Sequence, residues 1–122
     1  MSINYKRLHH LQICIPSGEE ERARDFYLSK LGFQEIEKPK QLKKNGGFWA
    51  EIANIEIHIG VEKQVIPGKR HPAFEVNDIE NAREHLKKHN VTIQPQIEID
   101  GYKRFSFYDP FKNRIEFIEP TK

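Results

Sequence analysis

Residues 109–119 read DPFKNRIEFIE, which is the pattern of a turn followed by a strand. The Asp-Pro and Lys-Asn pairs within residues 109–113 are typical of a tight turn. Residues 114–117 then alternate between polar and apolar side chains, which predicts a strand over 114–119 with one buried face. The same Ile-Glu alternation occurs at residues 55–57, so the last strand has a counterpart half a chain earlier.

The order of predicted elements repeats along the chain. The first half predicts a strand at 8–15, a helix at 19–31 and strands at 33–37, 48–53 and 55–61, with an exposed loop at 39–47. The second half predicts a strand at 71–76, a helix at 79–89 and strands at 91–94, 104–108 and 114–119. Each half is therefore a βαβββ module, and the class is α+β.

The length of 122 residues gives room for one domain built from both modules. Residues 1–62 form the first module, residues 70–122 form the second, and the Pro-Gly segment at 63–69 links them. A module of about 60 residues buries too little apolar surface alone. The modules must therefore pair within one chain or between two, and a homodimer is expected.

Composition excludes several classes of function. The chain has 20 Lys and Arg against 18 Asp and Glu, interleaved to a net charge of +2, so no basic footprint for nucleic acid or a membrane surface is present. The one cysteine excludes an intrachain disulfide, and residues 1–10 lack the apolar core of a signal peptide. The expectation is a cytoplasmic protein with a small-molecule substrate and with neither nucleic-acid nor membrane partners.

Strand parity places five metal-capable side chains on the faces that carry no helix: His10, Glu56, His58, His71 and Glu116. Imidazole and carboxylate suit Zn, Ni, Fe, Mn or Co, and two histidines with one carboxylate leave positions open for substrate or water. Each position taken alone is more simply explained as the polar half of a strand. The match of His with His and Glu with Glu across the repeat favours a metal site.

Cys14 shares the polar face of its strand with His10. A lone strand cysteine is more simply explained as a small buried hydrophobe than as a nucleophile. The basic segment at residues 38–44 is most simply a solvated loop, and the alternative is a lid over an anionic substrate.

Four stretches resemble the glyoxalase, bleomycin-resistance and extradiol-dioxygenase superfamily, also called vicinal oxygen chelate proteins. They are LHHLQICIP at 8–16, FYLSKLGF at 26–33, HPAFEV at 71–76 and DPFKNRIEFIE at 109–119. The resemblance covers nearly the whole chain and implies two βαβββ modules that form a cupped mixed sheet around a divalent metal ion. The chain departs from the family's DPFGN pattern at Lys112, which leaves the shape of that turn open.

The resemblance implies metal ligands at His10, His71 and Glu116. A fourth ligand belongs to the last strand of the first module, where the repeat register favours Glu56 and the preference of metals for imidazole favours His58. These two residues are separated by about 6.6 to 7 Å along a strand, so one ion is not expected to take both. Of the two, we favour His58.

The activity implied is that of a glyoxalase-like, metal-dependent lyase or isomerase that chelates two neighbouring oxygens of a small substrate. Glu116 or Glu56 is expected to act as a ligand and proton shuttle, with His58 or Tyr108 as the second acid/base residue. Arg104 and Trp49 are expected to bind substrate, although Trp49 could instead fill the core. The alternatives are a dioxygenase or thiol transferase of the same superfamily, and a metal-free drug-binding protein of the bleomycin-resistance type.

Overall fold

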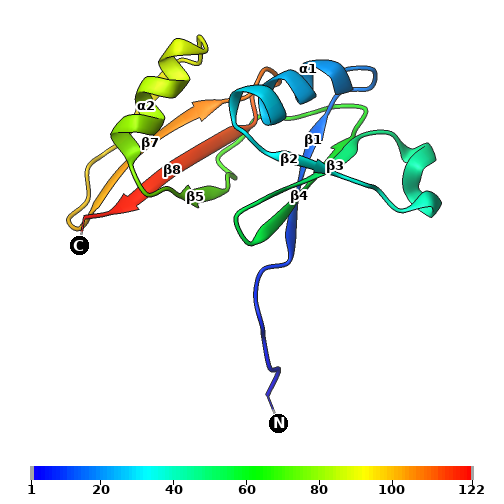
Figure 1. Ribbon diagram of the computed structural model, residues 1–122, viewed down its shortest axis with the longest axis horizontal. Helices are drawn as coiled ribbons and strands as arrows, with labels where there is room; N and C mark the ends of the chain where they lie inside the picture. The colour runs from blue at the N-terminus through cyan, green and yellow to red at the C-terminus, as the bar shows by residue number, and fades with distance from the viewer. Residues whose placement is uncertain (1, 122) are drawn as a thin grey trace. The chain divides into compact units, whose positions relative to one another are not determined.

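The computed structural model describes residues 2–121, which divide between Val65 and Ile66 into two compact units. Each unit has its own four-stranded mixed sheet and its own helix (Figure 1). The boundary lies within the segment expected to be the linker. The α+β class and the βαβββ order of both modules are confirmed.

Unit 1 has strand order β1-β4-β3-β2, in which β1 and β4 are parallel and the other pairs are antiparallel. Its elements are β1 (His10–Ile15), α1 (Glu20–Arg24), the π-helical turn η1 (Asp25–Lys30), β2 (Gln34–Ile36), the 3₁₀ helix η2 (Lys40–Asn45), β3 (Phe48–Ile52) and β4 (Ile55–Val61). The first strand begins at His10 rather than at residue 8. The carbonyl of His9 still accepts the N–H of Glu56 at 3.1 Å, and the chain before it extends away from the sheet toward the N-terminus (Figure 1).

The helix expected over residues 19–31 is α1 followed directly by the wider turn η1. The N–H of Leu31 donates to the carbonyl of Phe26 at 2.9 Å, which is the i to i+5 pattern of a π turn. Phe26 and Tyr27 are both buried, as their apolar spacing predicted. Spacing over six residues does not distinguish i+4 from i+5 hydrogen bonding, so the wider turn could not be predicted.

Unit 2 has strand order β5-β8-β7-β6, in which β5 and β8 are parallel. Its elements are β5 (Ala73–Glu75), α2 (Ile79–Lys88), β6 (Ile93–Pro95), β7 (Tyr102–Tyr108) and β8 (Arg114–Pro120). The strand expected at 71–76 is shorter than predicted, so His71 precedes it. The strand expected at 104–108 is longer and begins at Tyr102.

In each unit the helix covers the apolar face of the sheet, and the opposite face carries polar side chains. Unit 1 buries Ile13, Ile15, Phe26, Tyr27, Phe48, Ile57 and Ile59, whereas unit 2 buries Ile79, Leu86, Phe105, Phe107 and Ile115. Full burial of one such side chain stabilises the fold by about 1.5 to 3 kcal/mol. Every helix within residues 2–121 is too short and too polar to cross a membrane.

The turn between β7 and β8 is built around the buried carboxylate of Asp109. Its Oδ1 accepts the N–H groups of Phe111 and Asn113, both at 2.8 Å, and its Oδ2 accepts Asn113 Nδ2 at 2.8 Å. Lys112 has φ +73°, in the left-handed region that favours glycine. The turn therefore holds a conformation that suits the glycine of the family pattern better than a lysine.

Replacing Lys112 by glycine is expected to raise the free energy of unfolding by up to about 1 kcal/mol. Relief of the left-handed strain, about 1 to 2 kcal/mol, exceeds the entropy lost by ordering a glycine, about 0.5 to 1 kcal/mol. Urea denaturation of Lys112→Gly, Lys112→Ala and the parent chain measures the effect. Lys112→Ala keeps the Cβ atom and should unfold with the same free energy as the parent. If Lys112→Gly and Lys112→Ala are equally stable, Lys112 is not strained in the left-handed region.

Candidate functional site

In unit 1 the predicted site residues share the sheet face that the helix leaves open. The register of β1 and β4 places His10 opposite Glu56 and Gln12 opposite His58. The register of β3 and β4 places Trp49 opposite His58. Because side chains opposite one another on paired strands lie on the same face, these residues form one surface.

Three rings are stacked on this surface. The ring centroids of Trp49 and His58 are 3.7 Å apart with planes at 3°, and those of His58 and His10 are 4.0 Å apart with planes at 17°. His58 is only 6% exposed, because a ring covers each of its faces. Trp49 is half-buried and stacked on the open face, so it lies beside His58 and not in the apolar core.

His58 and Glu56 contact each other through their side chains. His58 Nε2 lies 2.9 Å from Glu56 Oε1, so the separation expected from the strand rise applies to the main chain and not to the functional groups. This hydrogen bond is the main cause that lowers the pKa of Glu56 below its usual value. An ionised carboxylate only accepts, so Nε2 carries a proton and Nδ1 keeps a lone pair in the neutral ring.

His10 is favoured in its neutral form. Partial loss of hydration, and then the nearby rings of His58 and His9, lower its pKa below the ordinary value. His9 Nδ1 lies 3.0 Å from His10 Nδ1. A neutral imidazole is the form that binds a metal ion, so these neighbours suit His10 to the role of ligand.

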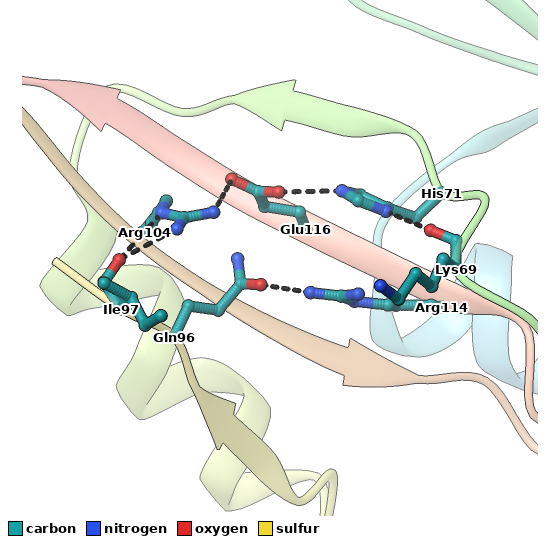
Figure 2. Close-up of polar contacts among 7 residues, drawn as sticks. All are labelled: Lys69, His71, Gln96, Ile97, Arg104, Arg114 and Glu116. Atoms are coloured by element: carbon teal, nitrogen blue, oxygen red, sulfur yellow. Dashed lines mark hydrogen bonds and ion pairs between the residues drawn. The ribbon is translucent and has the colours of Figure 1, made fainter. Parts of the chain in front are cut away.

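In unit 2 the buried carboxylate of Glu116 lies between a histidine and an arginine (Figure 2). His71 Nε2 is 2.9 Å from Glu116 Oε1, and Arg104 Nη1 is 3.6 Å from Glu116 Oε2. Taking a carboxylate out of water is costly unless opposite charge or hydrogen bonds compensate. Arg104 supplies that compensation, and His71 adds to it only when its Nε2 carries a proton.

The hydrogen bond of the second ring nitrogen of His71 determines whether the nitrogen that faces Glu116 carries a proton. His71 Nδ1 lies 2.7 Å from the carbonyl oxygen of Lys69, which only accepts, so Nδ1 carries a proton. In a neutral ring Nε2 then presents a lone pair toward the Glu116 carboxylate. The 2.9 Å contact therefore needs a proton or a cation between the two groups.

The remaining predicted residues lie on the same open faces. Tyr108 lies opposite Arg114 on β8 and is 45% exposed, and Arg104 contacts Glu116. Cys14 lies on the open face of unit 1, where burial is the main cause that raises the pKa of its thiol. A protonated thiol is a weak nucleophile, which agrees with a structural role.

Each unit holds part of the predicted ligand set: His10, Glu56 and His58 in unit 1, and His71 and Glu116 in unit 2. Across residues 2–121, no three His, Cys, Asp or Glu side chains meet in a group that could hold a metal ion. Imidazole and carboxylate are nevertheless the donor types that a borderline divalent ion takes. The imidazole and carboxylate groups present are therefore of the types that bind such an ion.

Two residues of the unit 2 network were not predicted. Arg114 donates to the side-chain oxygen of Gln96, beside the Glu116 contacts (Figure 2). Arg114 is two residues before Glu116 on β8, so strand parity could have identified it. Gln96 follows β6 and has no periodic signal that marks it.

The family pattern of the Glyoxalase/Bleomycin resistance protein/Dioxygenase superfamily matches residues 7–117. The fold and the match together show that the chain belongs to this superfamily. It is 31% identical to the uncharacterised YwkD of Bacillus subtilis strain 168 over 93% of this chain and 97% of the relative. It is 32% identical to the uncharacterised YaeR of Escherichia coli K12 over 96% and 98%.

Solved structures agree with the fold. A Bacillus anthracis protein assigned to the glyoxalase family is 43% identical, with a TM-score of 0.93 over 99% of this chain and 100% of that protein. TnmS3, an antibiotic-binding protein of Streptomyces sp. CB03234, has a TM-score of 0.74 over 98% and 100% at 18% identity. The latter similarity extends to the fold alone.

Proposed function

We propose that the chain is a glyoxalase-like, metal-dependent enzyme of lyase or isomerase type that binds two adjacent oxygens of a small substrate. The observation that carries the proposal is the contact between His71 and Glu116. The Nδ1 proton of His71 is committed to Lys69, so its Nε2 faces the carboxylate as a ligand nitrogen does. Metal-binding histidines usually donate their other ring N–H to a carbonyl or carboxylate in this way.

The proposed ligands are His10, His71, Glu116 and a fourth residue, His58 or Glu56. A catalytic ion of this kind takes about three protein ligands and keeps a position open, and a lone histidine–carboxylate pair is too few. His58 is favoured as the fourth because its Nδ1 keeps a lone pair, while Glu56 holds the ring through Nε2. Glu56 would then orient the ligand and not bind the ion itself.

A bound divalent ion would supply Lewis-acid polarisation of the two substrate oxygens. The chain's own groups supply proton transfer and positioning. Glu116, as a carboxylate, can take a proton from a carbon next to a carbonyl, with His58 or Tyr108 as the second acid/base group. Trp49 keeps the His58 ring in a fixed plane through the 3.7 Å stack.

A metal-free binding protein is the second candidate. The stacked rings of Trp49, His58 and His10 offer an aromatic surface on which a planar drug could lie. TnmS3 shows that this fold occurs in an antibiotic-binding protein. A dioxygenase or a thiol transferase of the same superfamily is a further alternative, because both activities use a similar set of metal ligands. We expect the protein to act as a homodimer in the cytoplasm.

A neutral compound with two adjacent oxygens separates the two candidates. Acetohydroxamic acid is expected to bind the zinc-loaded protein at least about tenfold more tightly than the metal-free protein, because chelation needs the ion. Acetamide, which lacks the second oxygen, is the control and should not discriminate. The emission of Trp49, the one tryptophan of the chain, reports binding. Equal affinity with and without zinc would favour the metal-free binding protein.

A further inference from the structure

We infer that the open face of unit 2 binds an oxyanion group of the substrate, a carboxylate or a phosphate, through Gln96, Arg104 and Arg114. The inference rests on the proposed function and names the class of substrate that this site takes. It is supported by the position of three donor groups, one side-chain amide and two guanidinium groups. All three belong to the network of contacts around Glu116.

The side-chain amide of Gln96 is held in one orientation and lacks an acceptor. Arg114 Nη2 donates to Gln96 Oε1, so the oxygen and nitrogen of the amide cannot exchange places. Gln96 Nε2 is buried, and within residues 2–121 it makes no hydrogen bond. Figure 2 shows this nitrogen turned toward the side chains of Arg104 and Glu116. A buried donor without an acceptor is costly, and a ligand oxygen would recover that cost.

The two guanidinium groups are fixed by consecutive residues of the segment after β6. Arg104 donates to the carbonyl of Ile97 from Nε at 3.2 Å and from Nη2 at 2.8 Å. Arg114 is held by Gln96, and that contact uses one of the five N–H donors of a guanidinium. The Nε–Nη2 edge of Arg104 is taken by Ile97, so Arg104 offers an anion only the remaining N–H groups of its two Nη atoms. Guanidinium groups held in place in this way suit the oxygens of carboxylate and phosphate groups.

The balance of charge favours an anion at this place. The negative charge of Glu116 is balanced by Arg104, whose Nη1 lies 3.6 Å from Glu116 Oε2. Arg114 then contributes a positive charge whose described partner is a neutral amide. Glu75 also lies on this face, but it is exposed and β8 separates it from Arg104, so water screens it. A group that only accepts hydrogen bonds complements all three donors.

The test is a titration of metal-free protein with sodium pyruvate in one arm and sodium phosphate in the other. Sodium chloride at matched ionic strength is the control. The reported signals are the ¹H–¹⁵N resonances of the Gln96 amide and of Arg104 Nε–H. Pyruvate or phosphate should shift these signals to saturation, whereas chloride should not, and the anion that binds more tightly identifies the natural group.

The variant Gln96→Leu removes the amide donor, and Arg114→Gln removes the unbalanced charge. Each should weaken anion binding by about tenfold, the effect of one charge-assisted hydrogen bond. Gln94→Leu is the matched control, because Gln94 lies on the same face but outside the network, and it should bind as the parent does.

The inference is overturned if Gln96→Leu binds both anions as tightly as Gln94→Leu does. It is also overturned if chloride shifts the same signals to the same extent. Because the titration contains no metal ion, its failure leaves metal binding by His10, His71 and Glu116 unaffected. A failure of metal binding, in turn, is measured without any anion and does not bear on these three donors.

Discussion

Glu116→Gln and His71→Ala are each expected to weaken zinc binding by more than about a hundredfold. Loss of an outer partner of a metal ligand already costs about 10 to 100-fold, and loss of a ligand itself costs more. Glutamine preserves the shape of Glu116 and can still accept from Arg104, so the fold should survive. Equilibrium dialysis against a zinc buffer, with far-UV circular dichroism to check folding, measures both effects.

The control for this pair is Glu75→Gln. Glu75 lies on the same open face of unit 2 but is exposed and is not a predicted ligand. It should bind zinc as the parent chain does. A folded Glu116→Gln variant that keeps one equivalent of zinc at the affinity of Glu75→Gln would remove Glu116 from the ligand set.

His58→Gln is expected to weaken zinc binding more than Glu56→Gln does. In the first variant a ligand nitrogen is lost, whereas in the second the carboxylate that orients the ring is replaced by an amide that still accepts from Nε2. The second loss should lie within about 10 to 100-fold. Competition with a zinc buffer gives the affinities of the two variants.

Trp49 provides an independent readout of the same comparison. Its ring is stacked on His58, so zinc binding at His58 should change its emission in the parent chain and in Glu56→Gln, but not in His58→Gln. A larger loss of affinity in Glu56→Gln would show that Glu56 is the ligand. The repeat register, which pairs Glu56 with Glu116, would then be the better guide.

The internal repeat predicted the order of elements in both units, and strand parity predicted that Glu56, His58 and His10 share one face. That shared face follows from the period of two along a strand, which the sequence displays directly. The match of His10 with His71 was wrong in register, because His10 lies opposite Glu56 whereas Ala73, and not His71, lies opposite Glu116. The sequence left Trp49 open between substrate binding and the core, and the register with His58 places it on the open face.

Features outside regular strands were not predictable in the same way. His71 precedes β5, because the following Pro72 has no N–H and joins the sheet only by accepting from the Glu116 N–H at 3.0 Å. The hydrogen bond from His71 to Lys69 therefore depends on a local turn and not on a periodic pattern. Gln96 belongs to an irregular segment, and its contact with Arg114 depends on side-chain reach across the sheet.

Metal dependence is tested by the metal content of the untagged protein, purified without chelator and then titrated with zinc. We expect one equivalent of a transition metal per chain, either retained through purification or taken up on titration. The emission of Trp49 should reach its end point at that stoichiometry. Less than about a tenth of an equivalent at purification, with no uptake on titration, would contradict a metal-dependent enzyme and leave the metal-free binding protein.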